Sequence, residues 1–193
     1  MAKLAYKSLR IFIGFMTVFI FSFSFAAKAS DKPNLYFYGD SNTKGGKVTL
    51  SYPFQLGGFN YAIGGTTSAD TLQMVSEGSA RRDGYCFLMT GLNDIHRGTT
   101  TGRIVVNMLK IGELLKARGC NIYLLTYPEV PGVTQDEHKQ LISLNSLIRR
   151  QYLKVIDTAE VFGNKDIEDD YHFGQTTQNQ IAELIRNTLN GIN

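Results

Sequence analysis

The 193-residue sequence has few of the residues that hold metals and redox centres, since it contains only two cysteines and three histidines. It has no C-x-x-C motif and no cluster of cysteine and histidine. Structural zinc sites and dithiol redox sites need such spacings, so the sequence predicts no metal and no redox cofactor. Cys86 and Cys120 then form either a disulfide or two buried free thiols, which pack as small hydrophobic side chains.

Motifs that bind phosphates and dinucleotides are also absent. A P-loop has the pattern G-x-x-x-x-G-K-[ST], and the stretch that comes closest ends in Gly46-Lys47. Its first glycine is replaced by Ser41 and its hydroxyl residue by Val48. The dinucleotide fingerprint G-x-G-x-x-G does not occur, and Ser41 is not framed by G-x-S-x-G. These absences argue against nucleotide binding and against the α/β-hydrolase type of serine enzyme.

Only one long apolar run is present, and it lies at the N-terminus. Residues 1–29 contain a basic start, an apolar stretch from Ile11 to Phe25 and an A-x-A site at 27–29. We predict a signal peptide over 1–29 and a single domain over 30–193. An uncleaved membrane anchor is the alternative, because the apolar stretch approaches the ~17 residues that the shortest spanning helices need. Neither cysteine directly follows the apolar stretch, which argues against a lipid-anchored protein.

An excess of positive charge is absent once the predicted signal peptide is removed. That segment holds four of the 20 Lys and Arg residues and none of the 17 Asp and Glu residues. The remaining chain has 16 basic and 17 acidic residues, a net charge of −1. The pI of about 8.8 therefore describes the targeting segment as much as the working protein, and it does not support a nucleic-acid partner.

The rest of the sequence alternates short apolar runs with longer segments of helical period. It has no internal repeat, low-complexity tract or proline-rich linker. This alternation predicts one α/β domain with a parallel sheet covered on both faces. The expected strands are Leu35–Tyr38, Phe59–Ile63, Tyr85–Thr90, Ile122–Tyr127 and Lys154–Asp157. The expected helices are Ser68–Ser76, Gly102–Arg118, Gln135–Gln151 and Thr176–Leu189.

Polar residues that suit a serine nucleophile follow the first three strands. In parallel sheets the ligand site lies outside the carboxyl ends of the strands, and Ser41 comes just after the first apolar run. A serine nucleophile needs a base, a group that orients the base and donors for an oxyanion. Gly64-Gly65 and Asn93 follow the next two strands and are candidate donors, although these residue types also suit turns and helix caps.

The base has to be one of three histidines. His138 lies in a charged helical segment and is expected to be solvated, and His96 either borders the site or lies on a surface loop. His172 comes just before the last helix. Asp169, three residues earlier, can fold back to accept a hydrogen bond from Nδ1, which leaves Nε2 to take the serine proton.

Four short motifs occur in a fixed order: GDSN at Gly39–Asn42, Gly65, GLND at Gly91–Asp94 and DDYH at Asp169–His172. With these motifs the chain resembles the SGNH hydrolase family, also called GDSL esterases or lipases, over nearly all of residues 30–193. The resemblance implies a flavodoxin-like three-layer sandwich around a five-stranded parallel sheet of order 2-1-3-4-5.

The resemblance also implies a role for each motif residue. Ser41 is the nucleophile, His172 the general base and acid, and Asp169 the residue that orients His172. The N–H groups of Ser41 and Gly65 and the side chain of Asn93 form the oxyanion hole. This chemistry requires no metal and no organic cofactor.

These observations predict a periplasmic or secreted serine esterase, with no stable membrane anchor once the signal is cleaved. Its substrate is a small-molecule, lipid or glycan ester, and Tyr127, at the end of the fourth strand, is expected to line the substrate site. The chain has no long insertion to form a deep acyl tunnel, which favours a short acyl group such as acetyl on a glycan. The alternatives are a lysophospholipase or thioesterase, an O-acyltransferase to a sugar hydroxyl, and a non-catalytic glycan-binding module.

Overall fold

The computed structural model describes residues 32–46, 48, 50–79, 82–161, 167–169 and 171–191. The predicted signal peptide at residues 1–29 and the predicted start of the mature domain at Ser30 lie outside the described residues. In the part of the chain that is described, no helix combines the length and the apolar character needed to cross a membrane.

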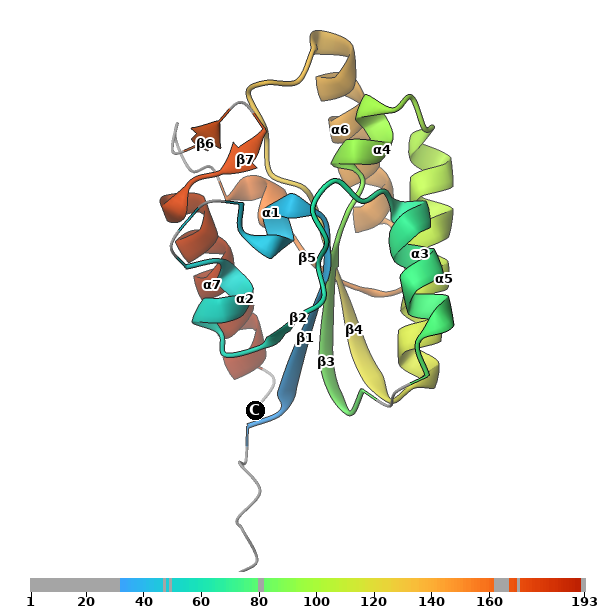
Figure 1. Cartoon of the computed structure of the whole chain (residues 1–193), viewed down its shortest axis with the longest axis vertical. Helices are drawn as coiled ribbons and strands as arrows, with labels where there is room; N and C mark the ends of the chain where they lie inside the picture. Colours follow the sequence, from blue (N-terminus) through green and yellow to red (C-terminus); the bar gives the residue numbers. More distant parts are fainter. Residues whose placement is uncertain are drawn as a thin grey trace, which may run out of the picture. The chain divides into compact units, whose positions relative to one another are not determined.

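Five parallel strands form the central sheet in the order β2-β1-β3-β4-β5 (Figure 1). This order confirms the predicted flavodoxin-like α/β fold. The side chains of Phe37, Phe87 and Tyr123 stack in a row across the three middle strands, with ring centroids 4.9 and 5.6 Å apart. The strands are β1 (Asn34–Gly39), β2 (Phe59–Asn60), β3 (Gly84–Met89), β4 (Cys120–Leu125) and β5 (Lys154–Ile156).

Helices cover both faces of the sheet and complete the predicted three layers (Figure 1). Helices α3 (Ser68–Glu77), α5 (Thr101–Ala117) and α6 (Gln135–Arg149) pack together on one face. Helices α2 (Tyr52–Gln55) and α7 (Gln175–Asn190) pack together on the other face. The four long helices agree with the predicted ones to within two residues at each end.

The long helices form where the sequence supplies an apolar stripe, and two of them also begin with a side-chain cap. On α5, Ile104, Met108 and Ile111 recur at helical spacing and are fully buried against the sheet. Helix α3 begins with a reciprocal capping box between Thr67 and Asp70, and α6 begins with the same motif between Thr134 and Glu137.

Strand β2 is shorter than predicted and ends at Asn60 instead of Ile63. The side chain of Asn60 accepts a hydrogen bond from the N–H of Ala62 at 3.1 Å, so this backbone group turns away from the strand ladder. Tyr61 and Ile63 still donate to the carbonyl oxygens of β1, at 2.8 and 3.1 Å. The segment therefore continues along β1 as an irregular extension that leads to Gly64-Gly65.

Besides α2 and a 3-10 turn at Thr158–Glu160, three short elements that carry Ser41, Asn93 and His172 were not predicted. Helix α1 (Ser41–Lys44) follows β1, and helix α4 (Leu92–His96) follows β3. A hairpin of β6 (Ile167–Asp169) and β7 (His172–Phe173) precedes α7. One turn of helix or two residues of strand are too short to show a hydrophobic period, which is why the sequence pattern does not reveal them.

Cys86 on β3 and Cys120 on β4 form a disulfide. Of the two predicted alternatives, the structure therefore contains the bridge and not a pair of free thiols. Both cysteines are buried, and their Cα atoms are 5.8 Å apart. Cys120 is the first residue of its strand, so the bridge joins the amino-terminal part of the sheet, at the end away from Ser41.

Candidate active site

Ser41 lies at the carboxyl end of β1, where the chain turns directly into α1. Gly39 has φ +155°, and a Cβ atom there would lie 2.2 Å from the carbonyl oxygen of Met89 and 2.4 Å from Thr43 Oγ1. Only glycine fits this approach of β1 to β3 and α1. Asp40 caps α1 by accepting a hydrogen bond from the N–H of the residue after Ser41. Ser41 is thus the first residue of the helix, and its own N–H lies outside the helical ladder.

The β6–β7 hairpin brings Asp169 and His172 together, since the two residues are paired directly opposite each other. Asp169 Oδ1 also accepts hydrogen bonds from the N–H groups of Tyr171 and His172, at 2.9 and 3.0 Å. These contacts close the turn and fix the carboxylate. Hydrogen bonds from the N–H of Tyr171 and, to a smaller extent, from the His172 side chain lower the pKa of Asp169. Asp169 is therefore ionised at neutral pH.

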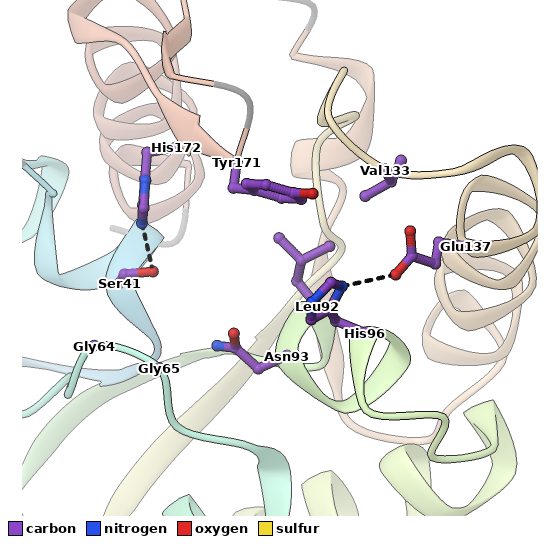
Figure 2. A pocket seen from close by; sticks show the side chains of 10 residues that line it. All are labelled: Ser41, Gly64, Gly65, Leu92, Asn93, His96, Val133, Glu137, Tyr171 and His172. Carbon is purple, nitrogen blue, oxygen red and sulfur yellow. Dashed lines mark hydrogen bonds and ion pairs between the residues drawn. The ribbon is translucent and has the colours of Figure 1, made fainter.

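Ser41, His172 and Asp169 form a continuous chain of hydrogen bonds. His172 Nε2 lies 3.0 Å from Ser41 Oγ (Figure 2), and His172 Nδ1 lies 2.8 Å from each carboxylate oxygen of Asp169. An ionised carboxylate only accepts hydrogen bonds, so Nδ1 carries the proton and the lone pair of Nε2 faces the serine hydroxyl. This arrangement can remove a proton from Ser41.

The predicted oxyanion donors come from three segments around Ser41. Asn93 Nδ2 donates to the carbonyl oxygen of Thr66 at 3.0 Å, and an amide nitrogen has a second hydrogen to donate. Among the described residues, the N–H groups of Ser41 and Gly65 donate to no protein acceptor. The three residues all line one cavity (Figure 2). Their role in stabilising an oxyanion stays a prediction.

Arg97 and Asp94, for which no role was predicted, hold the segments that carry Gly65 and Asn93. Arg97, just after α4, donates from Nη2 to the carbonyl oxygen of Gly65 at 2.9 Å. Asp94 is buried and accepts hydrogen bonds from both the N–H and the hydroxyl of Ser68, each at 2.6 Å, which ties α4 to the start of α3. The partners are 32 and 26 residues apart in sequence, so no local pattern indicates them.

Asn42 clamps the segment that carries His172. Its side chain is buried and spans both neighbours of that histidine: Nδ2 donates to the carbonyl oxygen of Tyr171 at 2.9 Å, and Oδ1 accepts from the N–H of Phe173 at 2.8 Å. Nδ2 also donates to the hydroxyl of Tyr127 at 2.7 Å. The amide thus fixes the backbone on either side of His172 and sets the distance from the imidazole to Ser41.

Tyr127 does not line the cavity beside Ser41, so the expectation that it contacts the substrate is wrong. Its side chain is only 1% exposed, and its hydroxyl donates to the carboxylate of Asp40 at 3.1–3.2 Å. Its ring packs against that of Phe173, 5.6 Å between centroids. The Tyr127 side chain therefore lies in the core beneath the site, where a large aromatic ring is more stable than above the cavity.

Asp40 is a fully buried carboxyl group directly before Ser41. Burial raises its pKa to about 6, against the opposing effects of the hydrogen bonds from Asn42 N–H and from Tyr127. Burial and the nearby Asp40 charge raise the pKa of Tyr127 well above its ordinary value, so the tyrosine stays protonated and donates. Asp40, Asn42 and Tyr127 form a buried polar network under the site.

A cavity of about 490 Å³ opens beside Ser41 (Figure 2). One end contains Ser41 and His172, and the other contains His96 and Glu137, whose Nδ1 and Oε1 atoms are 2.9 Å apart. Of the two positions considered for His96, the structure shows the one that borders the site. The cavity is lined by Ser41, Gly64, Gly65, Leu92, Asn93, His96, Val133, Glu137, Tyr171 and His172.

The third histidine lies away from this cavity, and it is less solvated than predicted. His138 is half-buried on α6, and its Nδ1 atom lies 3.5 Å from a carboxylate oxygen of Glu129. Among the described residues, no group of three or more His, Cys, Asp or Glu side chains is arranged to hold a metal ion.

The fold is shared with solved structures of lipolytic proteins and acylhydrolases. A member of the lipolytic G-D-S-L family from Veillonella parvula has a TM-score of 0.71 and 17% identity, covering 80% of this chain and 96% of its own. A putative acylhydrolase from Bacteroides fragilis has a TM-score of 0.68 and 20% identity, covering 83% and 90%. An acetylxylan esterase from Geobacillus stearothermophilus has a TM-score of 0.66 and 18% identity, covering 80% and 93%.

The resemblance predicted from four short motifs is thus confirmed at the level of the fold. The likeness extends over nearly the full length of each of these structures. In comparisons of sequence, no protein-family model and no curated protein matches this chain. Structural likeness at such low identity leaves the reaction to be inferred from the site itself.

Proposed function

We propose that this protein is a serine esterase of the SGNH hydrolase family, with Ser41, His172 and Asp169 as its catalytic triad. The observation that carries the proposal is the hydrogen-bonded chain from Ser41 Oγ through His172 to Asp169, with 3.0 and 2.8 Å between the atoms. A serine hydroxyl is a weak nucleophile unless a positioned base removes its proton. The shared fold of esterases and acylhydrolases supports the same reaction class.

The geometry leads to a two-step mechanism. His172 Nε2 takes the proton of Ser41 while Ser41 Oγ attacks the acyl carbon of the ester. The negative charge that develops on the carbonyl oxygen is stabilised by the N–H groups of Ser41 and Gly65 and by Asn93 Nδ2. His172 then gives its proton to the leaving alcohol. In the second step, His172 deprotonates a water molecule that attacks the acyl-enzyme and releases the carboxylic acid.

The favoured substrate is an ester with a short acyl group, such as an acetylated glycan. The lack of a long insertion supports this preference over a lysophospholipase or thioesterase, and the acetylxylan esterase among the structural neighbours acts on a substrate of this kind. Hydrolysis of p-nitrophenyl esters from acetyl to palmitoyl tests it. We expect the largest kcat/KM with acetyl, and a preference for long chains would contradict the assignment.

Export of the protein is part of the proposal. The predicted signal peptide at residues 1–29 directs a domain of residues 30–193 to the periplasm or the exterior. The disulfide between Cys86 and Cys120 supports this location, since such bonds persist in oxidising compartments and are rare in the cytosol. Mass spectrometry of the protein recovered from its native host would identify the first residue, which we expect near Ser30.

The triad is tested by Ser41→Ala, with Ser143→Ala, an exposed serine on α6, as the matched control. We expect Ser41→Ala to lower kcat for p-nitrophenyl acetate by about 10⁴–10⁶-fold, because removal of a nucleophile disables the whole triad. A fluorophosphonate should label the unaltered protein and Ser143→Ala but not Ser41→Ala. If Ser41→Ala hydrolysed the ester at the original rate, the nucleophile would be another residue.

A further inference from the structure

The cavity contains a second carboxylate–histidine pair that the proposed mechanism does not use. His96 comes from the end of α4 and Glu137 from the first turn of α6, and they face the cavity at the end away from Ser41 (Figure 2). Glu137 is held on both oxygens, because Oε1 contacts His96 Nδ1 at 2.9 Å and Oε2 accepts from Thr134 N–H at 2.7 Å. The pair is therefore pre-organised before any ligand binds.

The Glu137 carboxylate determines which ring nitrogen of His96 donates a hydrogen bond and which one accepts. The N–H of Thr134, followed by the side chain of His96, lowers the pKa of Glu137, so its ionised carboxylate accepts from Nδ1–H. In the neutral ring, Nε2 is then a hydrogen-bond acceptor. The ring is also supported from one side, since its centroid lies 6.0 Å from that of Tyr171 in an edge-to-face arrangement.

Tyr171 connects this pair to the proposed reaction centre. It directly precedes His172, and its ring extends along the cavity from His172 toward Glu137 and Val133 (Figure 2). The alcohol oxygen of the ester must reach His172 Nε2 to receive a proton, so the alcohol portion of the substrate extends along the Tyr171 ring toward His96. We propose that His96, oriented by Glu137, binds a hydroxyl group of this alcohol portion, which makes the substrate an ester of a neutral polyhydroxylated ring such as a sugar.

The lining of the cavity favours a neutral polyol over the other substrates. A ring with apolar C–H faces and hydroxyl edges fits a wall made of Leu92, Val133 and the Tyr171 ring that ends in a polar pair. An apolar alcohol would displace water from the His96–Glu137 pair and would offer no hydrogen bond in its place. None of the ten residues that line the cavity is Lys or Arg, so the charge of Glu137 would oppose an anionic lipid headgroup.

The inference rests on the proposed esterase function, and its test separates the two. Methyl 6-O-acetyl-glucoside and cyclohexylmethyl acetate are both acetates of a ring-bearing primary alcohol, and they differ mainly in the ring hydroxyls. Acetate release from each is measured for the unaltered protein, His96→Leu and Glu137→Gln. His138→Leu is the matched control, because this histidine of α6 also lies near a carboxylate, that of Glu129, but is outside the cavity.

We expect the unaltered protein to prefer the sugar ester and His96→Leu to reduce the ratio of the two kcat/KM values by about tenfold, the effect of losing one hydrogen bond. The reduction should be mainly in KM, Glu137→Gln should show part of it, and His138→Leu should keep the original ratio. Hydrolysis of both esters with no preference, or an equal loss on both in His96→Leu, would overturn the inference while leaving the esterase function intact. Failure to hydrolyse p-nitrophenyl acetate as well would instead refute the proposed function.

Discussion

His172 and His96 line the same cavity (Figure 2), and each has nearly the same hydrogen bond to a carboxylate, 2.8 Å to Asp169 for His172 and 2.9 Å to Glu137 for His96. Their surroundings differ. His172 has 30% of its side chain exposed, and its second nitrogen lies 3.0 Å from a serine hydroxyl. His96 has 63% of its side chain exposed, and the described residues place no hydroxyl or thiol against its second nitrogen.

The comparison shows what a carboxylate does for a histidine and what it does not do. In both pairs the carboxylate fixes the ring and its tautomer. Among the described residues, only at His172 does the other nitrogen contact a serine hydroxyl, with Gly65 and Asn93 lining the same cavity. A carboxylate that binds one ring nitrogen of a histidine therefore holds the lone pair of the other nitrogen in a fixed direction. The groups around that second nitrogen determine whether it takes a proton or binds a ligand.

Replacing each histidine by alanine tests this comparison with the largest expected effect. His172→Ala removes the base and should lower kcat for p-nitrophenyl acetate by about 10⁴–10⁶-fold. His96→Ala removes no reacting group and should lower kcat by less than tenfold. Equal losses from the two substitutions, in proteins with the same melting temperature, would show that both pairs take part in the chemistry.

Asn93→Ala tests whether helix α4 contributes to catalysis through the Asn93 side chain. Asn93 and His96 both lie on this helix, but only Asn93 is expected to contact the developing oxyanion. We expect Asn93→Ala to lower kcat by about 10²–10³-fold, equivalent to roughly 2.7–4 kcal/mol of transition-state stabilisation. Circular dichroism should show an unchanged fold. A variant that only raised KM would place Asn93 in ground-state binding.

Asn42→Leu tests whether the buried hydrogen bonds around His172 are needed for catalysis. Asn42 fixes the backbone on both sides of His172, whereas the described residues include no comparable buried clamp around His96. Leucine has a similar size but makes no hydrogen bond. We expect kcat to fall by about 10–100-fold with little change in KM, because a misplaced base weakens proton transfer more than binding.

The same variant needs a control for general loss of structure. Phe173 and Tyr127 remain buried around position 42, so a lower melting temperature is also expected. Kinetics measured well below that temperature separate the two effects. If kcat were unchanged at full folding, Asn42 would contribute to stability but not to the position of His172.

The last prediction concerns stability and not turnover, because the carboxyl group of Asp40 is fully buried whereas those of Asp169 and Glu137 are partly exposed. Its pKa is about 6 in the folded protein against an ordinary value of 3.8. Between these values the folded state holds the proton more tightly than the unfolded state does. The stabilisation is therefore complete below about pH 4 and is lost as the pH rises through about 6, a change of about 3 kcal/mol.

Asp40→Asn removes this titration. The free energy of unfolding of the variant relative to the unaltered protein should increase between pH 4 and pH 8, as measured by urea denaturation. The carboxylates of Asp169 and Glu137 are present in both proteins and cancel in the difference. A difference that stayed constant with pH would show that Asp40 does not titrate in this range.

Much of the fold could be predicted because its long elements carry a strong local pattern. The stripe of Ile104, Met108 and Ile111 repeats over several turns, and the strands are short runs of buried residues bounded by turns. The order of the strands came from the resemblance to a family and not from the pattern itself, since no local signal states which strands are neighbours.

The contacts among Ser41, His172 and Asp169 could be predicted from chemistry and spacing, whereas the contacts that support them could not. Asp169 and His172 are three residues apart, so a single turn brings them together. The contacts of Asn42 with Tyr171 and Phe173 span 129 and 131 residues. Tyr127 was misplaced for the same reason, because its partner Asp40 is 87 residues away. Such contacts depend on how the elements pack, and sequence periodicity does not encode that.

Helix α4 has a consequence for how this site can change. Asp94 binds it to Ser68 from below, while Leu92, Asn93 and His96 all point from it into the cavity (Figure 2). Because the anchor lies between Asn93 and His96 and faces the other way, the side chain at position 96 can be exchanged while the backbone that carries Asn93 stays in place. Mutational libraries that seek new substrates should therefore vary position 96 first and leave positions 93 and 94 untouched.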